Sequence, residues 1–176
     1  MYWLKALGGL TVLLSAAGLG AVQSMEYQRR IRALSEMRRL FLLLSGEIRS
    51  SRTPVPEAFA HMALRMEGRY REFLRVMAQR LDRMEGENFP ALWKRTLKEY
   101  FGGRDSDLKK QDLELLYSFG DMFGYLDTEM QLNAIRFLQE QLLDRLGQLS
   151  GACAGQMRMA RLLGVCGGIF LVILLM

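Results

Sequence analysis

The hydrophobic positions of this chain gather at its two ends, and most charged positions lie between them. Residues 6–22 form one run without charge, and residues 162–176 form a second. Lys5 stands outside these runs, whereas arginines follow the first run and precede the second. The arginines nearest to the runs are Arg29, Arg30, Arg32, Arg38, Arg39, Arg158 and Arg161. Because basic residues favour the cytoplasmic side of membrane spans, the pattern predicts two transmembrane helices with a cytoplasmic domain between them.

The lengths of the two apolar runs set the limits of the expected spans. A helix needs roughly 17–25 apolar residues to cross a bilayer. The first run reaches the lower limit and gains length if Lys5 extends to the interface. The second run covers only ~22 Å, so its flanking residues must contribute or the membrane must thin locally. We therefore expect transmembrane helices at residues 3–23 and 158–176, and a cytoplasmic domain at residues 24–156.

A cleaved signal peptide is the alternative interpretation of the N-terminal run. Lys5 would supply its positive region, and Gly18, Gly20 and Ala21 would supply small residues near a cleavage site. The arginines that follow the run argue against export. A membrane anchor is therefore preferred, and cleavage of the segment stays open.

Between the two runs, apolar residues recur at intervals of three and four, and no segment alternates as a strand would. We therefore expect an all-α membrane hairpin whose cytoplasmic part is a bundle of about six helices. Breaks are expected near Ser51, Gly68, Gly86, Gly102 and Gly124. No proline separates the first and last helices from the apolar runs, so each is expected to continue outward as one long helix.

Polar residues and prolines predict where the inner helices begin. Thr53-Pro54 is expected to start the second helix, and Asn88 to cap the fourth. Ser106 or Asp107 is expected to cap the fifth helix, and Asp127 the sixth. The apolar face expected for the sixth helix consists of Met130, Ala134, Phe137, Leu138, Leu142, Leu146 and Leu149.

The formal net charge of +5 raises the question of an acidic partner. The arginines crowd beside the apolar runs, where anionic lipid would attract them. No basic stripe interleaved with aromatic residues supports nucleic-acid binding. We therefore expect contact with membrane lipid and no nucleic acid.

Residues with catalytic potential are few. His61 is the single histidine and has no second metal ligand at helical spacing, so we expect it to be a surface residue. The chain has no phosphate-binding glycine loop and no nucleophile motif. Cys153 and Cys166 would lie about 20 Å apart on one helix, too far for a disulfide. We expect no catalytic residue, no metal and no cofactor.

Glycines recur every four residues towards the C-terminal end of the chain. Small residues at this interval let helices approach closely in a bilayer, so we expect them to pack the two long helices together. The alternatives are a weakened, flexible helix and self-association. The glycines in question are Gly147, Gly151, Gly155, Gly164 and Gly168.

Three stretches follow one another as in a known protein family. They are residues 53–58 (Thr-Pro-Val-Pro-Glu-Ala), residues 115–120 (Leu-Leu-Tyr-Ser-Phe-Gly) and the apolar residues 162–175. Between the second and third stretches lie Gly124, Asp127, Gln131 and Leu138. In order and spacing the set resembles the stage III sporulation protein AB family over nearly the whole chain. The chain departs from the family pattern between residues 147 and 155, where a more charged helix would be expected.

The resemblance implies an integral protein of the mother-cell membrane facing the forespore, with the central domain cytoplasmic and both termini on the opposite side. Such proteins belong to the secretion-like channel between the two cells. Their cytoplasmic domain is similar to the inner-membrane platform of type II secretion. The implied partners are a companion secretion-type ATPase, stage III sporulation protein AA, and other channel components. Assembly into a homo-oligomer is left open.

Residues that match the platform pattern are candidates for partner contact, with helix capping and tight packing as the alternative explanation. They are Thr53, Pro54, Gly120, Gly124, Asp127 and Gln131. The expected function is a noncatalytic platform that couples the ATPase to the membrane complex. A small membrane-anchored enzyme or sensor with an all-α cytoplasmic domain is the alternative. The lack of a catalytic constellation favours the platform.

Overall fold

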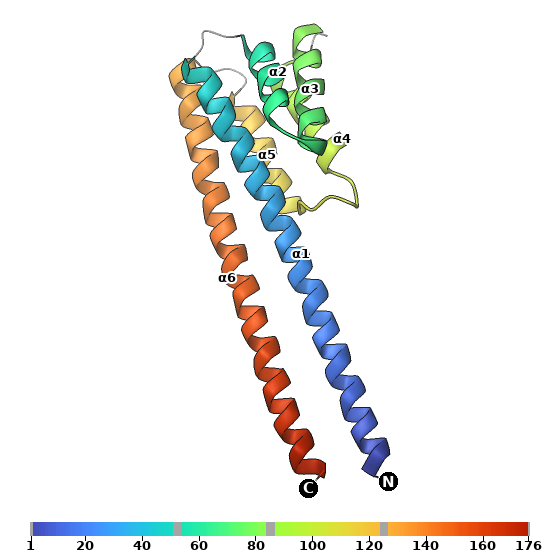
Figure 1. Cartoon of the computed structure of the whole chain (residues 1–176). Helices are drawn as coiled ribbons and strands as arrows, with labels where there is room; N and C mark the ends of the chain where they lie inside the picture. Colours follow the sequence, from blue (N-terminus) through green and yellow to red (C-terminus); the bar gives the residue numbers. More distant parts are fainter. Residues whose placement is uncertain (1, 51–53, 84–86, 124–126, 176) are drawn as a thin grey trace. The chain divides into compact units, whose positions relative to one another are not determined.

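A computed structural model of the chain describes residues 2–50, 54–83, 87–123 and 127–175, with side chains for residues 24–49, through the inner helices to residue 156, and at a few positions beyond it. Within these residues the chain forms α-helices and no strand (Figure 1), which confirms the expected all-α fold. The helices are α1 (Tyr2–Ser50), α2 (Val55–Arg65), α3 (Gly68–Arg83), α4 (Phe89–Phe101), α5 (Lys110–Phe123) and α6 (Thr128–Leu175).

The chain divides into two compact units. One consists of Met1–Ile31 and Gly147–Met176, and the other of Arg32–Leu146. The second unit, here called the helical domain, contains α2 to α5. The 49-residue α1 and the 48-residue α6 each contribute residues to both units. The expectation that the first and last helices pass the edge of the domain without a break is therefore confirmed.

The first unit contains the two segments that were expected to cross a membrane. Residues 3–23 and most of residues 158–176 have side chains outside those that the structure describes. Among the residues that it does describe, no helix has both the length and the apolar character needed for a membrane crossing. In the same unit Ser24 Oγ lies 3.8 Å from Cys153 Sγ. Cys153 is buried and is a free thiol, as expected.

Local capping explains where several inner helices begin. Asn88 Oδ1 accepts a hydrogen bond of 3.1 Å from the backbone N–H of Ala91, so the predicted cap of α4 is confirmed. Asp127 Oδ1 accepts one of 2.9 Å from the backbone N–H of Met130, which confirms the predicted cap of α6. The expected break before α3 is also confirmed, because Gly68 has a φ of 56°, a backbone conformation that favours glycine.

The predicted start of α5 is wrong, because the helix begins at Lys110 and not after Ser106 or Asp107. Ser106 Oγ instead accepts from the backbone N–H of Leu108 and closes a turn before the helix. Asp112, three residues after Lys109, accepts from the backbone N–H of Lys109 at 3.0 Å. A carboxylate at this third helical position that reaches back to the cap residue is half of a capping box. The buried Asp112 therefore places the helix start later than the first polar residues indicate.

Trp93 of α4 lies in the core of the helical domain and contacts an aromatic ring from each of four helices. Its ring centroid is 6.0 Å from that of Phe41 in α1 and 6.4 Å from that of Phe59 in α2. It is 5.4 Å from that of Phe73 in α3 and 5.3 Å from that of Phe119 in α5. All five side chains are fully buried. Tilted and edge-to-face aromatic pairs stabilise a core beyond their buried area, so this cluster holds α1 to α5 in one unit.

The helix α6 joins the core through a narrower face than the sequence predicts. Ala134, Leu138 and Leu142 are buried as expected. Met130 and Phe137, predicted on the same face, are 52% and 51% exposed. Apolar residues at intervals of three and four form a wide stripe on a helix. The other helices of the domain pack against only part of this stripe on α6, and the rest of it stays exposed.

Candidate binding site

The residues singled out from the sequence do not gather into one site. Thr53 and Gly124 lie outside the described residues. The carbonyl of Pro54 accepts a hydrogen bond of 3.1 Å from the N–H of Ala58 at the start of α2. The N–H of Gln131 donates at 2.9 Å to the carbonyl of Asp127 at the start of α6. At these described positions the structure shows helix-start geometry, and their role in partner contact stays a prediction.

Gly120 allows α4 and α5 to approach closely. A Cβ atom added to this buried glycine would lie 2.5 Å from Cδ1 of Trp93, a distance at which one of the two groups must move. Trp93 Nε1 donates a hydrogen bond of 2.7 Å to the carbonyl of Leu116, one turn earlier on α5. The indole ring therefore lies along α5 above a position that has room only for hydrogen.

The glycine series of α6 has a different environment. Gly147, Gly151 and Gly155 are exposed, and an added Cβ at any of them would meet no described atom within 4 Å. Gly164 and Gly168 have no described surroundings. Close packing of the two long helices at these positions therefore stays a prediction.

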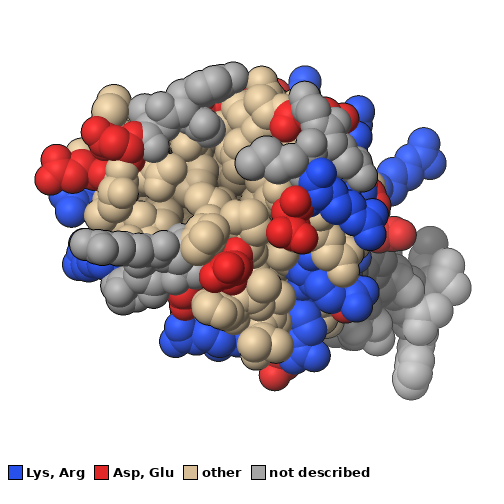
Figure 2. All heavy atoms as spheres, turned by 90° about the horizontal axis from the view of Figure 1, so that it is seen from above, with Lys and Arg blue, Asp and Glu red and all other residues tan. Residues whose placement is uncertain are grey.

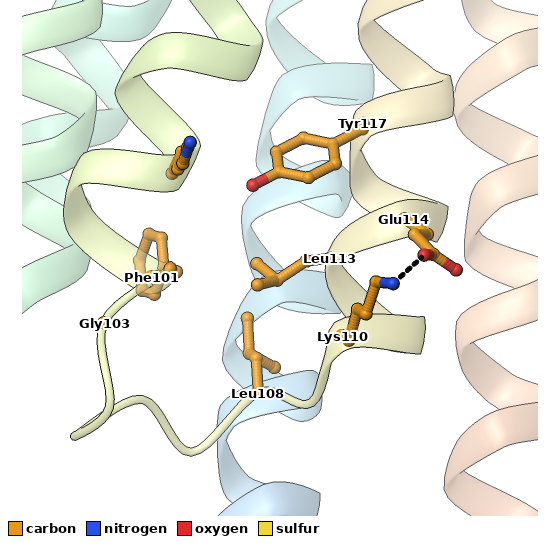
Figure 3. A pocket seen from close by; sticks show the side chains of 9 residues that line it. Phe101, Gly103, Leu108, Lys110, Leu113, Glu114 and Tyr117 are labelled. Carbon is orange, nitrogen blue, oxygen red and sulfur yellow. Dashed lines mark ion pairs between the residues drawn. The ribbon is translucent and has the colours of Figure 1, made fainter.

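A hollow of ligand size lies in the helical domain, between the C-terminal end of α4, the following loop and α5. Its volume is about 560 Å³, within the usual range for binding pockets. Figure 3 shows four side chains with apolar surface around it, namely Phe101, Leu108, Leu113 and Tyr117. None of the candidate residues from the sequence lines this hollow.

Polar groups stand at the edge of the hollow. Lys110 Nζ lies 3.8 Å from Glu114 Oε1, and both side chains are largely exposed. Lys98 also lines the hollow and is exposed, and within the described part of the chain its ammonium group has no ion pair. The hydroxyl of Tyr117 is protonated at neutral pH, as an ordinary phenol is, and can donate a hydrogen bond; burial raises its pKa further. The edge therefore presents donors to whatever occupies the hollow.

The loop between α4 and α5 is held by its own hydrogen bonds. The N–H of Gly102 donates to the carbonyl of Lys98 at 2.8 Å, and the N–H of Ser106 donates to the carbonyl of Gly103 at 3.1 Å. An added Cβ at Gly102 would lie 2.5 Å from the carbonyl oxygen of Lys98. Glycine at this position therefore lets the chain turn tightly at the mouth of the hollow.

Histidine and acidic residues do not assemble a metal site in the described residues, since no group of three potential ligands among them could hold an ion. His61 Nδ1 lies 3.4 Å from Glu47 Oε2, and Arg65 Nη1 lies 3.8 Å from Glu47 Oε1. The exposed His61 thus takes part in a group of polar contacts between α1 and α2. It lies on the surface, as the sequence predicts.

Figure 2 shows charged residues of both signs, Asp and Glu among Lys and Arg, scattered around a large area of uncharged residues on one face. Several basic residues of the helical domain are held in short ion pairs. Lys94 Nζ lies 2.7 Å from Asp121 Oδ1, and Arg80 Nη2 lies 2.8 Å from Glu99 Oε2. Exposed pairs of this kind each contribute at most about 1 kcal/mol to stability. Lys98 differs from these residues because it faces the hollow without an acidic partner among the described residues.

Comparison with known proteins gives two matches of different kinds. The family model of stage III sporulation protein AB matches residues 5–176. A solved structure described as stage III sporulation protein AB (SpoIIIAB) superposes with a TM-score of 0.64 at 22% sequence identity, covering 72% of this chain and 97% of that one. At this identity the structural likeness supports the fold alone. A comparison with curated protein sequences gave no match.

Proposed function

Because the chain belongs to the stage III sporulation protein AB family, we propose that it is a noncatalytic membrane platform of the sporulation channel complex between mother cell and forespore. Residues 3–23 and 158–176 cross the mother-cell membrane that faces the forespore, and both termini lie on its far side. The helical domain lies in the cytoplasm. There it binds a secretion-type ATPase, stage III sporulation protein AA, and couples this motor to the membrane complex.

One observation carries this proposal, namely that α1 and α6 are continuous helices of 49 and 48 residues that belong to both units. Their inner parts supply Phe41 and Leu138 to the buried core of the helical domain. Their outer parts contain the uncharged residues 6–22 and 162–175. An unbroken helix joins each outer segment to the domain through its backbone hydrogen bonds. In the proposed role these two helices transmit the action of the motor from the domain to the membrane segments.

The packing of the domain supports the same role. Tyr70 of α3 donates a hydrogen bond of 3.2 Å to the carbonyl of Ala33 in α1, and its ring centroid lies 5.2 Å from that of Phe101 in α4. Arg145 of α6 donates at 3.2 Å to the side-chain oxygen of Gln111 in α5. The two long helices are therefore each tied to inner helices that a motor could contact.

Binding to the motor is the test of this function. The full-length chain in detergent and in lipid nanodiscs is immobilised and presented with the purified companion ATPase. The proposal predicts saturable binding, which an unrelated membrane protein with two spans does not show. Absence of binding in both environments would overturn the coupling role.

A further inference from the structure

The hollow between α4 and α5 has the size and lining to take one large side chain of a partner. Its volume of about 560 Å³ exceeds that of an aromatic or leucine side chain. Phe101 and Leu108 at its base are almost fully buried, whereas Leu113 and Tyr117 are partly open to solvent. An apolar group placed against this lining would gain burial that the domain itself does not supply.

The groups at the edge of the hollow determine which partner fits. The ammonium group of Lys98 has no acidic partner in the described residues, and the hydroxyl of Tyr117 has no hydrogen-bond partner among them. Glu114 is the acidic residue of the lining, and it is already paired with Lys110. The lining thus carries two ammonium groups against one carboxylate, and this excess of positive charge, together with the Tyr117 donor, is complementary to a carboxylate of a partner.

We propose that this hollow docks an acidic segment of the companion ATPase, in which a large apolar side chain stands beside a carboxylate. The apolar side chain enters between Phe101 and Leu113, and the carboxylate pairs with Lys98 and accepts a hydrogen bond from Tyr117. The inference rests on the proposed function and adds to it the surface and the chemistry of recognition.

The surrounding loop makes the hollow ready for binding. Hydrogen bonds from Gly102 to Lys98 and from Ser106 to Gly103 hold the loop, and the buried Asp112 holds Lys109 at the start of α5. A partner therefore loses little free energy in ordering this surface.

The first experiment measures the affinity of the ATPase for full-length variants in nanodiscs. Lys98→Glu places a negative charge where the carboxylate would lie, and we expect it to raise Kd at least about tenfold. Arg136→Glu is the matched control, because Arg136 is an exposed residue of α6 outside the lining and the change in charge is the same. We expect this control to change Kd less than about twofold.

A second experiment needs no loss of binding and leaves the charges unchanged. A photo-crosslinking amino acid replaces Gly103, which lines the hollow and has open space for a side chain. The control position is Gly46 of α1, which has open space as well and lies outside the lining. We expect a crosslink to an acidic segment of the ATPase from position 103 and none from position 46.

The outcomes separate the two levels of the proposal. Reduced binding by Lys98→Glu alone, with a crosslink from position 103 alone, supports the docking site. Equal binding by wild type, Lys98→Glu and Arg136→Glu, or equal crosslinking from both positions, overturns the docking site and leaves the platform function standing. Absence of ATPase binding by the wild-type chain overturns the platform function, and the docking site with it.

Discussion

Trp93 Nε1 donates a hydrogen bond of 2.7 Å to the carbonyl of Leu116, and the same indole ring covers Gly120 one turn later. The bond fixes the position of the ring along α5, and the glycine fixes its distance from the helix backbone. Both helices that border the hollow are thereby held at one separation. The packing of the core and the shape of the candidate docking site thus depend on the same pair of helices.

Gly120→Ala should lower the free energy of unfolding by about 1–3 kcal/mol, because the added methyl group overlaps the Trp93 ring and forces the helices apart. The matched control is Gly46→Ala in α1, where an added Cβ meets nothing within 4 Å. This control should raise stability by about 0.5–1 kcal/mol, since alanine favours a helix. Denaturation of the full-length protein in detergent, followed by Trp93 fluorescence in a Trp3→Phe background, measures both. The same sign for both variants would contradict the account.

Stability above about pH 10 should depend on Tyr70. Burial, with smaller contributions from the nearby carboxylates of Glu36 and Asp107, raises the pKa of this phenol well above its ordinary value. The unfolded chain therefore loses the phenol proton at a lower pH than the folded chain does. The contribution of Tyr70 to the free energy of unfolding is therefore fully present below about pH 10. Above this pH the free energy of unfolding falls by up to about 1.4 kcal/mol per pH unit.

Tyr70→Phe tests this dependence because it removes the ionisable group and keeps the ring. Denaturation between pH 8 and pH 11.5 should show a shallower loss of stability for the variant than for the wild type. Tyr117→Phe, at a partly exposed position, should change the slope less. Parallel curves for the wild type and Tyr70→Phe would show that the phenol ionises equally in both states.

Truncation of two adjacent residues of α6 should cost different amounts of stability. Leu138 is fully buried, so Leu138→Ala should cost about 2–5 kcal/mol. Phe137 is 51% exposed, so Phe137→Ala should cost clearly less despite the larger side chain removed. The free energies of unfolding of both variants decide the point. A larger cost for Phe137→Ala would indicate that Phe137 belongs to the buried face of α6, as the sequence predicts.

The sequence predicts those features of the fold that depend on a few neighbouring residues. Asn88 and Asp127 cap helices because their side chains reach backbone groups three residues away, and this spacing is visible in the sequence. The continuity of α1 and α6 follows in the same way from the lack of a breaker. The predicted start of α5 is wrong because the residue that determines it, Asp112, lies inside the helix and is buried by tertiary packing.

The hollow could not be predicted because its lining comes from separate elements. Phe101 and Leu113 are apolar residues of two helices, and each alone is typical of a core position. The opening of the hollow between them depends on how far α4 and α5 stand apart, which Trp93 and Gly120 determine across 27 positions of sequence. The turn at Gly102 was the one local signal near this site.

Labelling of single cysteines decides whether the helical domain lies in the cytoplasm between two membrane spans. In a Cys153→Ala, Cys166→Ala background, Ser118→Cys marks the exposed surface of the domain and Tyr2→Cys marks the N-terminal end. The variants are produced in non-sporulating bacterial cells, where the far side of the membrane faces outward, and a maleimide that cannot cross membranes is applied to intact and to permeabilised cells. We expect Tyr2→Cys to react in intact cells and Ser118→Cys to react only after permeabilisation. Reaction of Ser118→Cys in intact cells would contradict this topology.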